Sequence, residues 1–413
     1  MRAAALLALM ASVLSGIPTQ EDRAERGEHS RTQAAIDVVR RTETATLADQ
    51  VRLCEVPAPP FGERARAEVV RDMLDAAGLR NVRRDREGNV VGEWPGRSAR
   101  PHLVLTAHLD TVFPEGTPVR VTREGSQLRG PGIGDNCRGL AVLVAVARAL
   151  SAARVQPEGS ISFAATVGEE GLGNLRGVRA LLTTTLKGPF DRFVAIDGSG
   201  SSITNVGVGS RRYRLSFRGL GGHSYNNFGR ANPAQALGRA IALISELRVP
   251  SSPKTTFTVS RVGGGTSVNT IPAEAWMEVD LRSQDEKALE ALDRSVHEIA
   301  KRAAALENAR WNQRGPVTVQ SQRVGDRPAG RTGPESEIVQ AALAVSKRLG
   351  VTASLIEGST DANLPMQMNI PAIAIGAGGR GFGAHTLQEQ FDSTDSVRGT
   401  ERALLLALTL SSR

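Results

Sequence analysis

Histidine and carboxylate side chains follow short apolar stretches at several separate places in this sequence. His108 and Asp110 come at the end of one such stretch, the adjacent Glu169 and Glu170 follow a second, and Asp197 follows a third. Neighbouring carboxylates repel each other unless a cation or a proton separates them. On extended backbone the two glutamates point apart, so one can bind a metal while the other acts as a base towards water.

Two further candidate ligands stand in or after glycine-rich turns. Asp135 lies in GPGIGDN (130–136), directly before an apolar helix-like stretch, and His385 follows the glycine-rich turn 376–383. As an isolated residue, Asp135 is equally well explained as the N-cap of that helix. A phosphate-binding loop is disfavoured, because no Lys-Ser or Lys-Thr pair follows the glycines.

Taken together, these residues predict a divalent metal site. Imidazole and carboxylate oxygen suit zinc or a similar ion. Cys54 and Cys137 are the chain's two cysteines, and there is no CxxC, so a structural zinc site is not expected. Cys137 is interpreted as a small buried residue at a helix start. With this many candidate ligands, one carboxylate could bridge two metals.

The order of the predicted elements suggests how these residues are positioned. Apolar strands at 102–108, 160–167 and 193–196, with a helix at 137–150 between the first two, predict an α/β unit with a mostly parallel sheet. Ligands of such sheets bind at the carboxyl ends of the strands. From about residue 206 the pattern becomes β-α-β-β-α-β, which is typical of a ferredoxin-like fold.

We therefore expect a catalytic unit interrupted by an insertion. The predicted boundaries are 21–205 for its first part, 206–320 for the inserted α+β domain and 321–413 for its second part. The polar segment 20–31 is expected to be a linker.

Residues 1–20 resemble a secretory signal peptide. Arg2 precedes an apolar stretch that ends at Leu14, which is too short to span a bilayer. We expect export to the periplasm or medium, or a cytoplasmic location if the segment is not cleaved. The alternative is an N-terminal helix that packs on the fold. No later segment is interpreted as a membrane span.

The charge balance allows several classes of partner. The 413 residues carry a formal net charge of +8, but aromatic residues are only 4%, too few for a surface that stacks on bases. No run of five or six like charges occurs, so nucleic acid is not an expected partner. The segment 206–320 has 16 Lys and Arg residues against 10 Asp and Glu, which is consistent with a positive cover over substrates that end in a carboxylate.

The motifs as a set resemble those of the two-zinc aminoacylase and carboxypeptidase family. That family includes glutamate carboxypeptidase, acetylornithine deacetylase, succinyl-diaminopimelate desuccinylase and peptidase T. The resemblance covers the chain from about residue 45 to its end. The matching segments, in the family's order, are HLDT (108–111), GPGIGDN (130–136), GEEGLG (168–173), AIDG (195–198), GLGGHS (219–224), GGGTSVNTIP (263–272), DLRS (280–283), STDAN (359–363) and GAH (383–385).

The resemblance implies a metal-ligand set. His108 and Asp197 would hold one zinc, Glu170 and His385 would hold the other, and Asp135 would bridge them. Cobalt or manganese are possible substitutes. The peptide bond after Asp135 is expected to be cis.

The resemblance also implies roles for residues around the metals. Glu169 would be the general base and Asp110 would orient His108. His223, in some members from the partner subunit, would stabilise the oxyanion. Asn269 would donate to the substrate or oxyanion, and Arg282 would pair with a substrate carboxylate. The inserted domain would serve as a lid and as the surface of a possible homodimer.

The function implied is hydrolysis of a peptide or N-acyl amino acid amide bond. A metallopeptidase acting on small peptides is favoured, and an N-acyl amino acid deacylase is the alternative. A non-catalytic, peptide-binding relative would require a lost ligand or base, and none is missing from the sequence. A phosphate- or nucleic-acid-binding α/β protein is disfavoured further.

Overall fold

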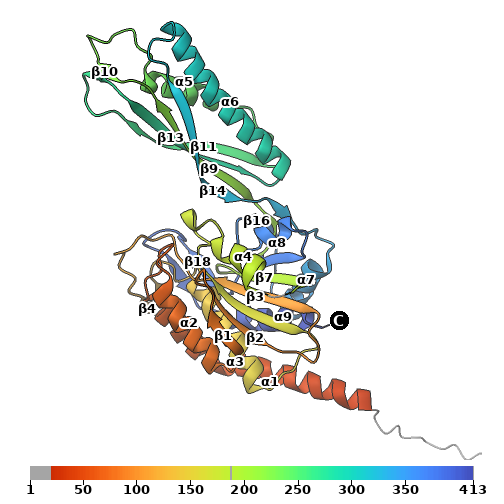
Figure 1. The fold of residues 1–413 in the computed structure, drawn as a ribbon. Coiled ribbons are helices and arrows are strands. Elements are labelled where there is room, and N and C mark those ends of the chain that lie inside the picture. The colour runs from red at the N-terminus through yellow and green to blue at the C-terminus, as the bar shows by residue number, and fades with distance from the viewer. Residues whose placement is uncertain (1–19, 187, 413) are drawn as a thin grey trace, which may run out of the picture.

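The computed structural model describes residues 20–186 and 188–412. The expected signal peptide therefore lies outside the described residues, apart from Gln20. The molecule has two units joined by a narrow waist, a catalytic unit built on a large sheet and a smaller lid (Figure 1). Among the described residues, none of the helices is both long and apolar enough to cross a bilayer.

The catalytic unit is built on a nine-stranded mixed sheet. Its inner strands β6, β3, β7 and β17 are parallel, and β2, β8 and β15 pair antiparallel at the two sides, while β16 pairs parallel with β8. This confirms the mostly parallel sheet. The strands, in spatial order, are β1 (Arg80–Arg84), β2 (Val90–Trp94), β6 (Ser160–Thr166), β3 (His102–His108), β7 (Arg192–Ile196), β17 (Ala372–Ile375), β8 (Ile203–Gly207) and β15 (Gly330–Arg331), with β16 (Leu355–Gly358) beside β8.

Helices cover both faces of this sheet. One apolar core lies under the long helices α1 (Gln20–Cys54), α2 (Arg64–Ala76), α3 (Cys137–Ala152), α7 (Glu337–Arg348) and α9 (Val397–Leu410). A smaller core on the other face includes residues of α4 (Arg176–Ala180), η2 (Leu181–Thr185) and α8 (Asn363–Gln367). The linker prediction for 20–31 is wrong, because α1 begins at Gln20; the segment is rich in Glu and Arg, which favour helix.

The lid has the predicted β-α-β-β-α-β order. It consists of β9 (Gly209–Arg218), α5 (Pro233–Ser245), β11 (Thr255–Gly264), β13 (Glu274–Ser283), α6 (Glu286–Arg310) and β14 (Thr318–Arg327). The sheet order β11-β13-β9-β14, with all neighbours antiparallel, is that of a ferredoxin-like domain. α5 and α6 cover one face, which forms the lid's own apolar core. The short strands β10 (Gly222–His223) and β12 (Thr270–Ile271) pair at the end of the lid away from the central sheet (Figure 1).

The chain enters and leaves the lid at neighbouring points. It crosses between β8 and β9 at Val208 and returns after β14 at Pro328, so β14 extends beyond the predicted boundary at 320 and β8 extends beyond the one at 206. The side-chain amide of Asn363 donates to the carbonyl oxygens of both crossing residues, each at 2.9 Å. One buried side chain therefore holds both connections.

A second small sheet connects two glycine-rich segments. It contains β4 (Thr122–Glu124), β5 (Gln127–Arg129), β18 (Arg380–Phe382) and β19 (Gln390–Asp392), in the order β18-β19-β5-β4. The pairing of β19 with β5 brings the segment before Asp135 beside the segment after His385. A single 3-10 turn, η1 (Gly171–Gly173), follows the two glutamates.

Candidate metal centre

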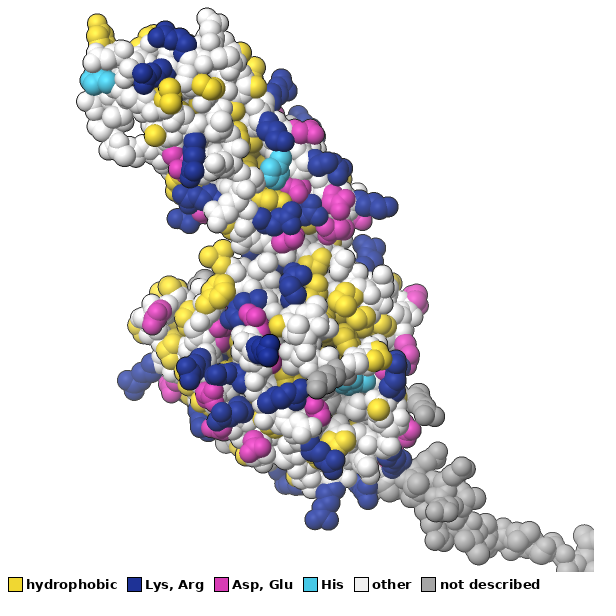
Figure 2. All heavy atoms as spheres, viewed as in Figure 1, with side chains coloured by type: hydrophobic (Ala, Val, Ile, Leu, Met, Phe, Trp, Pro, Cys, Tyr) yellow, Lys and Arg dark blue, Asp and Glu magenta, His cyan; other side chains and the backbone are white. Residues whose placement is uncertain are grey.

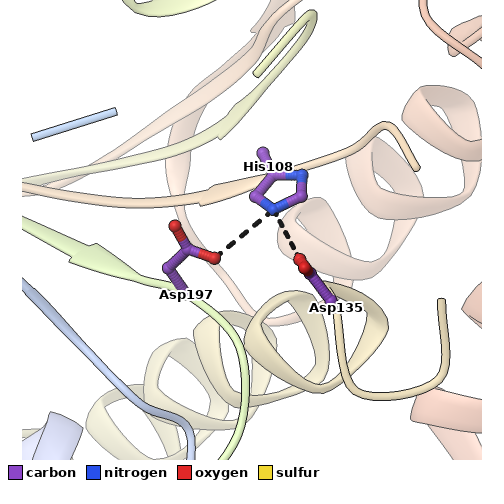
Figure 3. Close-up of side chains that lie close together, drawn as sticks. All are labelled: His108, Asp135 and Asp197. Carbon is purple, nitrogen blue, oxygen red and sulfur yellow. Dashed lines mark hydrogen bonds and ion pairs between the residues drawn. The ribbon is translucent and has the colours of Figure 1, made fainter. Parts of the chain in front are cut away.

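His108, the last residue of β3, lies against two carboxylates. Its Nε2 is 3.1 Å from Oδ1 of Asp135 and 3.5 Å from Oδ1 of Asp197, which follows β7 (Figure 3). Burial opposes protonation of this imidazole, but hydrogen bonds to the surrounding aspartates outweigh burial and hold the pKa of His108 well above its usual range. The carboxylates around Nε2 thus favour a positive charge at this position, and a divalent cation would supply it.

Asp135 faces a different imidazole with each of its oxygens. Oδ1 is the atom close to His108, and Oδ2 lies 3.2 Å from Nε2 of His385. Burial favours the protonated acid, but hydrogen bonds from both histidines hold the pKa of Asp135 well below its usual range. This geometry is that of a carboxylate bridge between two cations.

His385 and Glu170 complete the second half of the centre. Nε2 of His385 is 3.0 Å from Oε1 of Glu170, and hydrogen bonds to Asp135 and Glu170 raise the pKa of His385 to about 10. The donor atoms fall into three sets, each within 4.8 Å: His108, Asp135 and Asp197; Asp135, Glu170 and His385; and His108, Glu169 and Glu170. All three contain imidazole nitrogen and carboxylate oxygen and no thiolate, and the first two fit two zinc-like ions that share Asp135.

The loop that carries Asp135 is held by its neighbours. The peptide bond between Asp135 and Asn136 is cis, as expected. Asn136, not Asp135, is the N-cap of α3, because its Oδ1 accepts from the N–H of Gly139 at 3.1 Å. Its side chain also accepts from the N–H of Gly198 and donates to the carbonyl of Ile196. The N-cap explanation of Asp135 is therefore wrong, and its carboxylate is free to bridge.

The carboxylate of Glu389 supports the backbone of the same loop. Its carboxylate accepts hydrogen bonds from the N–H groups of Gly132, Gly134 and Asp135 at 2.8–2.9 Å. Burial raises the pKa of Glu389 to about 7, against the opposing effect of these backbone donors. A buried acid thus fixes the backbone of the bridging residue.

Asp110 positions two parts of the centre at once. Its carboxylate accepts from the N–H groups of Glu169 and Glu170, at 2.9 and 2.7 Å, and lies 3.6 Å from Nδ1 of His108. The closer partner of that Nδ1, at 3.0 Å, is the backbone oxygen of Asp110. Because the oxygen binds Nδ1–H, Nε2 is left to face the cations.

Glu169 is buried beside the ligands and has one cationic partner. Nη1 of Arg327, at the end of β14, donates to its Oε1 at 3.0 Å, and the same guanidinium also donates to its backbone oxygen. Burial raises the pKa of Glu169 well above its usual range, and the charge of Arg327 opposes that shift. A carboxylate with a raised proton affinity is suited to take up a proton.

His223 and Asn269 lie together but away from this centre. His223 is in β10, and the N–H of the neighbouring Ser224 donates to the backbone oxygen of Asn269 at 2.9 Å. Both side chains are exposed at the far end of the lid (Figure 1). Within one chain, the structure does not bring them to the metal ligands.

Arg282 belongs to a row of arginines at the base of the lid. Arg282 on β13 and Arg327 on β14 are both cross-strand partners of Ser210, so their side chains share the sheet face that the helices leave open. Arg212, two residues along β9 on that face, donates to the backbone oxygen of Gly171 at 3.2 Å. Asp280 pairs with both Arg212 and Arg282.

Sequence reasoning missed three residues of this site. Arg327 and Glu389 lie far along the chain from the groups they contact, and no motif singled them out. Asp361 stands inside the STDAN segment and accepts from the hydroxyl of Thr166 at the end of β6. Burial raises the pKa of Asp361 to about 6. The position of Asp361 in the STDAN motif is the sequence signal that could have identified it.

Comparison with known proteins finds a matching family and curated relatives. A family model described as peptidase family M20/M25/M40 matches residues 104–409. The succinyl-diaminopimelate desuccinylase of Bordetella avium is 26% identical over 66% of this chain and 75% of its own length. Carboxypeptidase G2 of a Pseudomonas species is 28% identical over 75% of this chain and 73% of its own.

Solved structures share the fold. The aminopeptidase PepT of Bacillus cereus superposes with a TM-score of 0.72 and 21% identity, over 89% of this chain and 98% of its own. A tripeptidase of Staphylococcus aureus gives a TM-score of 0.74 and 20% identity, with the same coverage.

Proposed function

The chain belongs to peptidase family M20/M25/M40, and from this premise we propose that it is a two-zinc exopeptidase for small peptides that carry a free carboxylate. The chain is a metal-dependent hydrolase of peptide or N-acyl amino acid amide bonds. The observation that carries the proposal is Asp135, whose two oxygens face His108 and His385.

The chain's own residues would divide the work around the two ions. His108 and Asp197 would hold one, Glu170 and His385 the other, and Asp135 both. When bound, such ions polarise the scissile carbonyl and acidify water. Glu169 would take the proton from the attacking water and transfer it to the leaving nitrogen, while Asp110 keeps the backbone of both glutamates in place.

The arginines of the lid favour a substrate that carries a carboxylate. Arg212, Arg282 and Arg327 lie on the open face of the lid sheet. Arg327 contacts Glu169, Arg212 contacts the backbone of Gly171, and Asp280 pairs with Arg212 and Arg282. A guanidinium fits a carboxylate with two parallel hydrogen bonds. N-acyl amino acids also carry such a group, and the desuccinylase relatives keep deacylation as the second candidate.

Two further proposals concern assembly and location. We propose a homodimer formed through the lid, in which His223 and Asn269 act on the partner's metal centre, since within one chain they lie at the end of the lid away from the metal ligands.

We also propose export, on the basis of Arg2 and the apolar stretch that ends at Leu14. Sequencing the N-terminus of the mature protein from each cell fraction tests export.

The decisive test is Glu169→Gln. We expect turnover to fall by about 10²–10⁴-fold, with two metal ions per chain retained, because the five proposed ligands do not include Glu169. The measurement is hydrolysis of a panel of dipeptides, tripeptides and N-acyl amino acids with zinc, cobalt or manganese, together with metal analysis. Glu298→Gln, an exposed acid on α6, is the control. Full activity in Glu169→Gln would contradict the mechanism.

A further inference from the structure

The two cysteines of this chain meet in the folded protein. Cys54 is the last residue of α1, and Cys137 is the first residue of α3. In the sequence α2 and the five strands β1 to β5 separate them. In the structure both belong to one small buried cluster, together with Leu47, Leu128, Ile133 and Phe391.

The two thiols are free in this structure, shielded from solvent and part of the same small cluster. Both residues are 0% exposed. The thiol of Cys54 donates to the backbone oxygen of Pro131 at 3.3 Å. A hydrogen bond with the Cys137 thiol, together with burial, raises the pKa of Cys54 well above its usual range.

A pair needs a different explanation from a single buried cysteine. One buried cysteine is ordinarily a small apolar residue that fills space. Here a chain of 413 residues contains two cysteines, and the fold places both in one buried cluster. Nothing in the metal centre uses either sulfur.

We propose that Cys54 and Cys137 form an intramolecular disulfide bond that anchors the metal-bridging loop to α1. The loop Gly130–Asn136 connects Cys137 to Asp135, and α1 already contacts it through Gln50, whose side-chain amide donates to the backbone oxygen of Ile133 at 2.7 Å. The disulfide makes this contact covalent. The inference does not depend on the proposed substrate class.

The oxidant is an external disulfide, either a low-molecular-weight one such as oxidised glutathione or a protein disulfide. The thiolate of one cysteine attacks it, forming a mixed disulfide and releasing one thiol. The second cysteine then attacks its neighbour's sulfur, which forms the Cys54–Cys137 bond and releases the second thiol. Two electrons and two protons pass to the oxidant. Because both sulfurs are buried in the folded protein, the exchange takes place while the chain folds.

A peptide map of the full chain tests the bond. The protein is refolded with reduced and oxidised glutathione, denatured, alkylated without reductant and digested with trypsin. We expect the peptides 53–64 and 130–138 to be recovered as one linked species from a protein that remains monomeric on a non-reducing gel. Their recovery as two separately alkylated peptides, or as links between chains, would overturn the proposal.

A second measurement tests the anchoring role. Protein refolded in the presence of a phosphine reductant should have a Tm lower by on the order of 5 °C than protein refolded with oxidised glutathione, and it should release bound zinc to a chelator faster. A phosphine is used because dithiols bind zinc themselves. The control is Cys54→Ala/Cys137→Ala, whose Tm and zinc release should not respond to the reductant. Equal responses in both proteins would overturn the anchoring role. The peptide map uses only the wild-type protein, so it tests the bond even if the double variant does not fold.

Discussion

At the level of single residues, two aspartates of the centre each serve two partners. Asp135 faces two histidines, and Asp110 holds the backbone of two glutamates while its carbonyl fixes the ring of His108. Such double use leaves little freedom in the position of any donor atom. The consequence is a centre that is ordered before cations bind.

Arg282 gives the first prediction at this scale. Arg282→Ala should lower kcat/KM by about 10- to 100-fold for substrates with a free carboxylate, because a charge-assisted hydrogen bond is lost. The KM for the matching amides should change little. Steady-state kinetics on each acid and its amide measure the difference. Arg218→Ala, at the other end of the same sheet face, is the control, and equal losses on acid and amide would count against the carboxylate role.

His102 gives a prediction about pH. Burial lowers the pKa of His102, whose Nε2 lies 2.9 Å from the hydroxyl of Ser162. Below pH about 6.5 the unfolded chain takes up a proton that the folded protein resists, so this histidine destabilises the fold as pH falls. The Tm of the wild type should therefore drop more between pH 7.5 and pH 5 than that of His102→Gln. Identical drops would show that His102 does not contribute.

The candidate ligands could be singled out in the sequence because each has a local signal. His108, Asp197 and Glu170 follow apolar strands, and parallel strands present their carboxyl ends at one edge. Arg327 could not be predicted, because its partner Glu169 lies in another unit of the fold. The same holds for Glu389, which reaches back to a loop formed much earlier in the chain.

At the level of elements, the ligand-bearing loops depend on pairing that local patterns do not reveal. The strands β5 and β19 are only three residues long, yet their pairing sets the metal loop beside the His385 segment. The neighbouring strand β18 lies within the glycine-rich stretch 376–383, which the sequence predicts as a turn. The long strands and helices were predicted because their apolar periodicity is strong.

Glu389→Gln tests the support of the metal loop. Glutamine keeps one oxygen acceptor but presents an NH₂ group where the carboxylate had its second, so one backbone N–H loses its partner. We expect a loss of about 1–3 kcal/mol in the free energy of unfolding and faster loss of metal to a chelator. Thermal unfolding and chelator kinetics measure these effects. Gln388→Ala, at an exposed neighbour, is the control. Unchanged stability and metal loss in Glu389→Gln would show that Glu389 does not support the loop.

At the level of the whole molecule, the lid is a separate body with its own core. Lys, Arg, Asp and Glu side chains lie intermixed on the lid face seen in Figure 2. Its polar sheet face carries the arginine row at one end, and the β10–β12 pair lies at the other. One chain cannot present both ends to one metal centre in this conformation.

The dimer proposal leads to a complementation experiment. His223→Ala and Glu169→Gln should each be nearly inactive alone. When the two variants are co-expressed with different tags, a mixed dimer should have one complete site, and about a quarter of wild-type activity should return. If His223 acts within its own chain, no mixed dimer has a complete site and no activity returns. Light scattering of the wild type gives its oligomeric state.

The two crossings at Val208 and Pro328 suit insertion of the lid, as a whole domain, into the catalytic unit. Gly207 of β8 pairs directly with Gly330 of β15, so without the intervening residues these strands would be an ordinary β-hairpin. The lid occupies the position of that hairpin's turn. A gene that replaced 209–327 with a short turn would still encode every strand and metal ligand of the catalytic unit. The same position could receive a different domain, so substrate choice could change by insertion while the metal chemistry is inherited intact.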